Sequence, residues 1–265
     1  MPVREARKLI AVDLDQTLCD TLQNLVEWHN DTYHTQLKLT DFDTLDFWKI
    51  WGGTSEESCR KIREFYDSRH FDEIKPIKDF ALEALKMLKK RGFQLVIITS
   101  RQQFIAEKTK KFIDRHYPGI FESIYFCNLN LSEKERLEYI SKPKSVICQE
   151  IGVDVLIDDS FEHALGCSDI GVDVLLYDRQ GIYKWNHQQL PSNVHRVFNW
   201  KQVMARFPKP SSPLKHCIYS FDDADDHYCY HDHSYCQYET IEVEEEELSE
   251  EELNYHYTKD NSVWV

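Results

Sequence analysis

Two carboxylates, Asp13 and Asp15, follow a short apolar run near the start of the chain. The run, residues 9–12, has the continuous apolar character of a strand that is buried on both faces. Two acidic side chains so close together at the end of a buried strand repel each other unless a cation neutralises them. The pair therefore predicts an oxygen-rich site for Mg²⁺, with carboxylates that can also attack an electrophile or exchange protons.

Polar residues also end two later apolar segments. Thr99 and Ser100 end the segment FQLVIITS, and Asp158 and Asp159 end the segment VDVLIDD. In open α/β sheets, ligands bind beyond the carboxyl ends of the strands. Three separate strands that carry polar groups at the same end of a sheet therefore predict one shared site.

The elements that must position these residues alternate between strands and helices. Residues 79–90 show helical spacing and end before Gly92, a usual C-terminal cap. Further strands are expected at 93–100, 122–128, 153–160 and 172–178, and further helices over about 103–116, before Gly152, after residue 160 and near 199–207. Right-handed crossovers between such strands give an α/β fold, a Rossmann-like doubly wound parallel sheet with helices on both faces.

Residues 20–75 interrupt this alternation. They contain helical patterns and an aromatic loop, DFDTLDFWKIWGG. Thr54 and Glu57 have the spacing of a capping box and predict a helix that runs to about His70. Because the insertion is too short for an independent domain, we expect a small helical cap that lies over the edge of the sheet.

The acidic residues are concentrated at the end of the chain. Of the 46 Asp and Glu residues, 15 lie within residues 211–265, which contain only two of the 32 Lys and Arg residues. Nearly all of the net charge of −14 therefore belongs to this segment. We expect a folded domain over residues 1–208 and a disordered acidic tail, rich in Tyr and His, over residues 209–265, which could bind a protein partner.

Five tail side chains could instead gather a metal ion: His227, Cys229, His231, His233 and Cys236. Their spacing fits no standard zinc-finger pattern, which favours a solvating or partner-binding tail. The composition also excludes other classes of protein, because there is no basic face for a nucleic-acid polymer and no apolar run of membrane-spanning length. The eight scattered cysteines favour a reducing, cytoplasmic location.

The strand-end residues resemble the motifs of the haloacid dehalogenase superfamily of aspartyl phosphotransferases. The sequence DLDQT, residues 13–17, matches the DxDxT motif, Thr99 matches the second motif, and Asp158 and Asp159 match the acidic pair. The resemblance covers about residues 8–180. The small helical cap, the TSR after the second strand and the IDDS of the acidic motif look like the 5′(3′)-deoxyribonucleotidase branch.

This resemblance implies a Mg²⁺-dependent phosphatase. Asp13 would attack phosphorus and form an aspartyl-phosphate, and Asp15 would act as general acid and then as general base. An acid at position 15 also favours phosphate hydrolysis over dehalogenation. The Mg²⁺ ligands would come from Asp13, Asp158 and Asp159, and from Asp15 through its backbone carbonyl.

The phosphoryl oxygens would be bound by Thr99, Ser100 and a lysine. Lys144 is favoured as that lysine because it opens the helical stretch before the acidic pair. The alternative lysines are Lys142, Lys108, Lys110 and Lys111.

The substrate implied by the resemblance is a small phosphorylated molecule, most directly a nucleoside monophosphate. The cap residues Phe42, Phe47, Trp48 and Trp51 could stack a nucleobase or form the core of the cap itself. Arg101 could meet a substrate phosphate or pair with a cap carboxylate. Two alternatives remain open, namely a phosphatase of another small phosphomonoester and a non-catalytic interaction protein that retains the fold.

Overall fold

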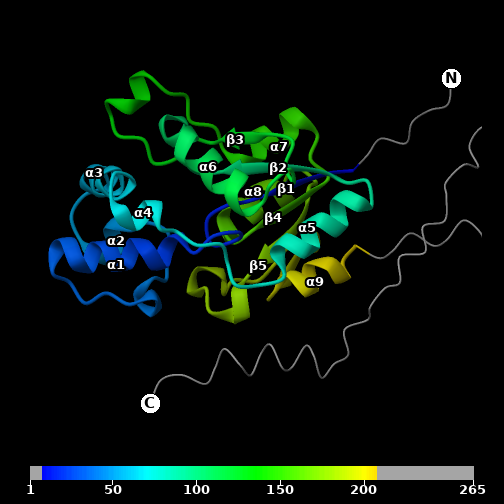
Figure 1. Ribbon diagram of the computed structural model, residues 1–265, viewed down its shortest axis with the longest axis horizontal. Coiled ribbons are helices and arrows are strands. Elements are labelled where there is room, and N and C mark those ends of the chain that lie inside the picture. The colour runs from blue at the N-terminus through cyan, green and yellow to red at the C-terminus, as the bar shows by residue number, and fades with distance from the viewer. Residues whose placement is uncertain (1–7, 208–265) are drawn as a thin grey trace, which may run out of the picture. The chain divides into compact units, whose positions relative to one another are not determined.

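Six parallel strands form the centre of the fold in the computed structural model, which describes residues 8–207 (Figure 1). The strands are β1 (Leu9–Val12), β2 (Gln94–Thr99), β3 (Ile124–Phe126), β4 (Val155–Asp158), β5 (Asp173–Tyr177) and β6 (Val194–Val197). Their order across the sheet is β3-β2-β1-β4-β5-β6, so the direction in which the chain adds strands reverses at β1 and β4. This arrangement confirms the predicted doubly wound parallel sheet.

Alternate strand residues point to opposite faces of the sheet, and each face has its own apolar core. Ile10 and Val12 of β1 pack in one core, whereas Ala11 between them packs in the other. The first core is covered by α5 (Ala81–Lys90), α6 (Ala106–His116) and α9 (Trp200–Ala205), and the second by α7 (Lys144–Ile151) and α8 (Phe161–Ser168). Burial on both faces explains why the central strands read as unbroken apolar runs.

The boundaries of the predicted elements hold in most places, and one strand was missed. Helix α5 ends as predicted, and Gly92 follows it with a φ of 86°, a left-handed conformation that favours glycine. Strand β6 was not predicted. Its sequence, VHRV, places an exposed His195 and a partly exposed Arg196 between two buried valines, because this strand lies at the edge of the sheet.

The inserted cap contains α1 (Thr21–Tyr33), α2 (Trp48–Trp51), α3 (Ser55–Tyr66) and α4 (Arg69–Asp72), coloured blue to cyan in Figure 1. The predicted capping box is present, because Thr54 N donates to Glu57 Oε2 at 2.7 Å and Glu57 N donates to Thr54 Oγ1 at 3.1 Å. The predicted end of this helix near His70 is wrong. Ser68 accepts a hydrogen bond from Phe71 N at 3.3 Å and so begins a separate helix, α4.

The cap and the sheet share one apolar core. Trp28 of α1 and Phe65 of α3 are buried in the same cluster as Ile10 of β1 and Leu85 of α5. The cap is therefore held against the sheet by apolar packing as well as by its two chain connections.

Two further sequence predictions concern the acidic tail and the absence of a membrane-spanning segment. The acidic tail at residues 209–265, with its proposed metal ligands and partner-binding role, lies outside the described residues 8–207. Within those described residues, no helix combines the length and apolar character needed to cross a membrane.

We predict that a chain ending at Pro210 folds as stably as the full chain. The last described helix, α9, buries Trp200 and Val203 completely, and Phe207 packs against Phe93 with 5.3 Å between ring centroids. A chain ending at Pro210 keeps these contacts, so its Tm should lie within about 2 °C of the full-length value.

A chain ending at Val197 provides the matched control. It loses three buried apolar side chains, each worth about 1.5–3 kcal/mol, from a domain whose total stability is about 5–15 kcal/mol. It should show no cooperative thermal transition by circular dichroism. Loss of that transition already at Pro210 would show that the domain boundary is wrong.

Candidate active site

The carboxyl ends of β1 and β4 bring two predicted residues together at the point where the strand order reverses. Asp13 directly follows β1, and Asp158 is the last residue of β4. Asp13 N donates a hydrogen bond to Ile157 O at 2.8 Å, which ties the end of one strand to the other. Both side chains are buried, with Asp13 only 5% exposed and Asp158 fully enclosed. The sequence prediction that separate strand ends form one site therefore agrees with the geometry.

Lys144 bridges these two carboxylates. It is the first residue of α7, and its Nζ lies 2.5 Å from Asp13 Oδ1 and 2.6 Å from Asp158 Oδ2. The ammonium is buried, and although burial alone would lower its pKa, the two carboxylates raise it above its usual value. Lys144 is thus held in its charged form between two anions.

The other candidate lysines lie elsewhere. Lys142 pairs with Glu150, and Lys108 donates to the Tyr66 carbonyl and to Asp72. The remaining two, Lys110 and Lys111, are exposed on α6.

Asp159 adds a third buried carboxylate to this site. Carboxylate oxygens of Asp13, Asp158 and Asp159 all lie within 4.8 Å of one another. Asp159 Oδ2 is buried and has no hydrogen-bond partner among the described residues. The side chain of Asp15 does not belong to this cluster of three carboxylates.

The charges of this cluster are not balanced by Lys144 alone. Burial raises the pKa of Asp13 to about 6, and burial beside Asp13 and Asp158 raises the pKa of Asp159 well above its usual value. Among these three carboxylates, only Asp158 has a lowered pKa, because Lys144 and His163 outweigh the effect of its burial. Three crowded carboxylates, one with an unpartnered oxygen, fit a divalent cation that prefers oxygen ligands.

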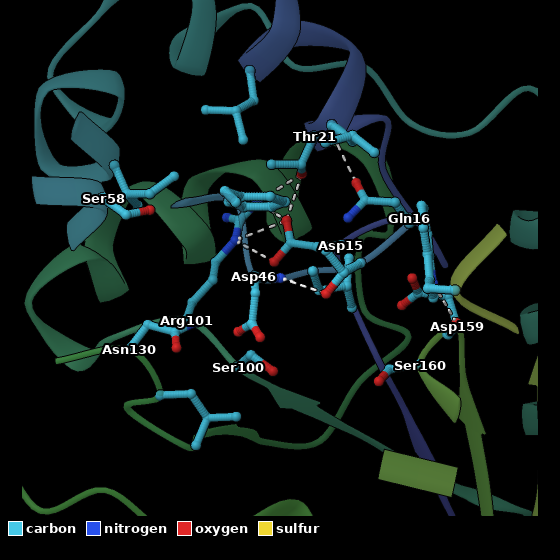
Figure 2. A pocket seen from close by; sticks show the side chains of 18 of the residues that line it. Asp15, Gln16, Thr21, Asp46, Ser58, Ser100, Arg101, Asn130, Asp159 and Ser160 are labelled. Atoms are coloured by element: carbon cyan, nitrogen blue, oxygen red, sulfur yellow. Dashed lines mark hydrogen bonds and ion pairs between the residues drawn. The ribbon is translucent and has the colours of Figure 1, made fainter. Parts of the chain in front are cut away.

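Asp15 instead faces Arg101. Burial alone would raise the pKa of Asp15, but the guanidinium of Arg101, 2.7 Å away, lowers it. Thr21 Oγ1 also donates to the same carboxylate at 2.5 Å. Figure 2 shows these contacts, with Asp159 on the other side of Asp15 in this view. Arg101 thus pairs with a carboxylate of the sheet edge and not with a carboxylate of the cap, whereas its contact with a substrate phosphate stays a prediction.

Thr99 and Ser100 lie at the end of β2, beside β1. Thr99 is fully buried, and its Oγ1 accepts a hydrogen bond from Arg101 N at 3.3 Å. Ser100 lines the cavity above the site. Both residues thus reach the same edge as Asp13, as the strand-end argument predicts.

A cavity of about 360 Å³ lies between this edge and the cap (Figure 2). The sheet edge contributes Asp13, Asp15, Ser100, Arg101 and Asp159 to its lining. The cap contributes the apolar side chains of Leu25, Leu45, Phe47, Trp48, Ile62 and Phe65, and also polar ones that include Asp43, Asp46, Ser58 and Arg63. A cavity of this size, lined by both polar and apolar side chains, is typical of small-molecule sites.

The cap aromatics divide between the two roles left open by the sequence. Phe47 and Trp48 line the cavity. Phe42 is buried, and Trp51 stacks on His29 with 4.8 Å between ring centroids and an interplanar angle of 1°. Phe42 and Trp51 therefore form part of the interior of the cap.

Polar contacts of α3 help to hold the cap over the cavity. Arg63 of α3 makes a two-point ion pair with Glu135, with Nε 2.7 Å from Oε1 and Nη2 2.8 Å from Oε2. Tyr66 Oη donates to Gln102 Oε1 at 2.9 Å. Both contacts join α3 of the cap to loops that follow strands of the sheet. They therefore help to set the distance between the cap and the carboxylates of the site.

Sequence reasoning missed residues that support Asp158 and Asp159. Trp185 Nε1 and Asn186 Nδ2 both donate to the carbonyl of Asp159, at 3.0 Å and 2.6 Å. His163 Nδ1 lies 3.1 Å from Asp158 Oδ1. Trp185 and Asn186 follow β5, so the rule that ligand sites form beyond strand ends could have pointed to that loop, although no motif marks them.

A doubly wound sheet with carboxylates and a lysine at its switch point, under a helical cap, defines the phosphatases of the haloacid dehalogenase superfamily. Solved structures have the same fold. A haloacid dehalogenase-like family hydrolase from Streptococcus pneumoniae aligns with a TM-score of 0.55 at 16% identity, over 76% of this chain and 99% of that one. A predicted phosphatase from Clostridium acetobutylicum aligns with a TM-score of 0.55 at 17% identity, over 76% of this chain and 97% of that one.

The chain belongs to the family described as 5′ nucleotidase, deoxy (Pyrimidine), cytosolic type C protein, whose sequence model matches residues 7–207. A Bacillus cereus protein named "Putative nucleotidase" is 26% identical over 195 residues, which cover 72% of this chain and 93% of that protein. The predicted superfamily, its nucleotidase branch and the class of hydrolase are thereby confirmed.

We predict that Lys144→Met strongly destabilises the metal-free protein. The change leaves Asp13 and Asp158 buried without the cation that they share. Removing one partner of a buried ion pair costs about 3–5 kcal/mol, and urea unfolding at pH 7 with a chelator should show a loss of that size. The loss should shrink toward about pH 5, because protons then neutralise the stranded carboxylates.

Lys142→Met is the control for this measurement. Lys142 pairs with Glu150 at 2.7 Å, but 44% of its side chain is exposed. An exposed pair contributes at most about 1 kcal/mol. Equal losses in the two variants would contradict the role of Lys144 as the shared cation of the site.

Proposed function

We propose that the protein is a Mg²⁺-dependent hydrolase of nucleoside monophosphates that acts through an aspartyl-phosphate on Asp13. One observation carries this proposal: the buried carboxylate cluster that contains Asp13 opens into the cavity beneath the apolar side chains of the cap. The carboxylates supply phosphoryl-transfer chemistry at one end of the cavity, and the cap supplies a surface for an organic group at the other.

The donor set suits Mg²⁺. The carboxylates of Asp13, Asp158 and Asp159, together with the backbone carbonyl of Asp15, would hold the ion. All of these donors are oxygens, and the unpartnered Oδ2 of Asp159 supports a ligand at this position. When bound, Mg²⁺ supplies positive charge that offsets the charge on the phosphoryl oxygens.

The reaction would take place in two steps on residues of this chain. In the first step, an Asp13 oxygen attacks phosphorus while the bond to the leaving oxygen breaks, and Asp15 gives that oxygen a proton. In the second step, Asp15 takes a proton from a water molecule as the water oxygen attacks the phosphorus of the aspartyl-phosphate. Inorganic phosphate leaves, and Asp13 is free again.

Three residues would hold the phosphoryl oxygens in place. Thr99 and Ser100 reach the site from β2. The Lys144 ammonium has three donors and makes two contacts, with Asp13 and Asp158, so one donor is left for a phosphoryl oxygen. The lysine would thus neutralise the carboxylates and bind the substrate with the same charge.

The rest of the substrate would lie against the cap. Phe47 and Trp48 line the cavity and offer aromatic surface on which a nucleobase could stack. The family description names deoxy and pyrimidine substrates and a cytosolic location, which makes pyrimidine deoxynucleoside monophosphates the first substrates to test and supports a cytoplasmic protein. Other small phosphomonoesters are the competing substrate class.

The proposal predicts phosphate release from nucleoside 5′-monophosphates in the presence of Mg²⁺. Measured across deoxynucleotides, ribonucleotides and sugar phosphates, kcat/KM should be highest for the nucleotides. Asp13→Asn should abolish turnover without loss of fold, because an amide does not attack phosphorus.

The matched control for this test is Asp169→Asn, an exposed position after α8 that should keep full turnover. A preference for sugar phosphates would contradict the proposed substrate class but not the proposed phosphatase mechanism. Near-normal turnover by a folded Asp13→Asn variant would contradict the aspartyl-phosphate itself.

Metal binding predicts a rise in Tm that does not depend on any assay of activity. A ligand present at 100 times its Kd adds about 2.7 kcal/mol to stability, so saturating Mg²⁺ should raise the Tm by several degrees. Asp159→Asn should remove most of this rise. Asp15→Asn should keep most of it, because Asp15 would bind the ion only through its backbone carbonyl. Equal responses of the two variants would show that the ligand set is wrong.

A further inference from the structure

The two oxygens of the Asp15 carboxylate have different surroundings. Oδ1 accepts hydrogen bonds from Thr21 Oγ1 at 2.5 Å and from Arg101 Nη2 and Nε at 2.7 Å and 3.2 Å. Oδ2 accepts one hydrogen bond, from Arg101 Nε at 3.0 Å. Because each carboxylate oxygen has about two lone pairs, Oδ1 is saturated by these donors and Oδ2 keeps one site free.

Arg101 is itself held rigidly. It is only 4% exposed, and its third nitrogen, Nη1, donates to the buried Thr109 Oγ1 on α6 at 3.1 Å. Its guanidinium lies 5.1 Å from the ring centroid of Phe71, in helix α4 of the cap. All three nitrogens of Arg101 are therefore committed, two of them to Asp15, and the side chain is locked between the sheet, α6 and the cap.

A guanidinium whose nitrogens are all bound by protein groups is suited to orient a neighbouring carboxylate. A guanidinium that approaches a carboxylate with two adjacent nitrogens fixes the rotation of that carboxylate as well as its charge, which a lysine does not do. Thr21 reaches Oδ1 from the start of α1, so donors from two elements define one orientation.

We propose that Arg101 is a positioning residue that fixes Asp15 so that Oδ2 is the atom that exchanges the proton. The inference rests on the proposed phosphatase function. When the phosphorus–oxygen bond of the substrate breaks, the proton on Oδ2 passes to the leaving oxygen. When water attacks the aspartyl-phosphate, the same Oδ2 takes a proton from the water, while Oδ1 remains bound by Arg101 and Thr21.

The experiment compares two leaving groups in Arg101→Lys. A nucleoside monophosphate has an alkoxide leaving group that needs a proton, whereas p-nitrophenyl phosphate has an aryl leaving group that does not. A positioned general acid contributes about 10²–10⁴-fold, so a misoriented one should lower kcat for the nucleotide by about 10- to 100-fold. KM should change by less than about threefold, and kcat for p-nitrophenyl phosphate should fall far less.

A double-mutant cycle tests whether Arg101 acts through Asp15. Residues that act as one unit have non-additive effects, so Arg101→Lys should lower kcat little further when Asp15→Asn is already present. The matched control is Arg179→Lys. Arg179 forms an ion pair with Asp20, and neither residue lines the cavity, so this change should leave the ratio of the kcat values for the two substrates unchanged.

Thr21→Val provides an independent test if Arg101→Lys does not fold. It removes one donor to Oδ1 and keeps the shape of the side chain, and it should produce a smaller loss with the same selectivity for the alkoxide leaving group. Equal losses on both substrates, or a full additional loss in the double variant, would overturn the positioning role while the phosphatase function stands. A wild-type protein that releases phosphate from neither substrate would overturn both.

Discussion

The buried ammonium of Lys144 between Asp13 and Asp158 is the interaction on which the rest of the site depends. Two carboxylates at the ends of adjacent strands cannot both remain charged in the interior without a cation. β1 and β4 are neighbours only because the strand order reverses between them, so the fold itself creates the repulsion. Helix α7 relieves it by beginning at Lys144, which places the ammonium 2.5 Å and 2.6 Å from the two carboxylates.

This arrangement also explains why the site needs a further cation. Asp159 follows Asp158 directly, and its carbonyl is fixed by Trp185 and Asn186. Its carboxylate is therefore held near the other two and has no cation of its own among the described residues. The strain is electrostatic, and a divalent ion bound by these oxygens would offset it.

Much of the fold and part of the site could be predicted because they depend on local patterns. Apolar runs that end in polar residues gave the central strands and the edge where Asp13, Thr99 and Asp158 meet. Strand β6 was not predicted because an edge strand is only half covered, so its sequence alternates between apolar and polar residues. The ion pair between Arg101 and Asp15 was not predicted for a different reason. The two residues are 86 positions apart in the chain, and their contact depends on the packing of β2 beside β1. Patterns within one element predict that element, whereas ion pairs between elements depend on the assembled sheet.

Asp13 and Asp15 show how two residues of the same type, two positions apart, acquire different chemistry. Burial, with Asp158 and Asp15 nearby, raises the pKa of Asp13, while Arg101 lowers that of Asp15 despite its burial. One carboxylate thus shares its site with other anions and Lys144, and the other is bound to a fixed guanidinium. The two carboxylates of one motif thus lie in separate electrostatic surroundings. The short motif supplies the two carboxylates, but the division between them comes from α7 and from the end of β2, which deliver a different cation to each.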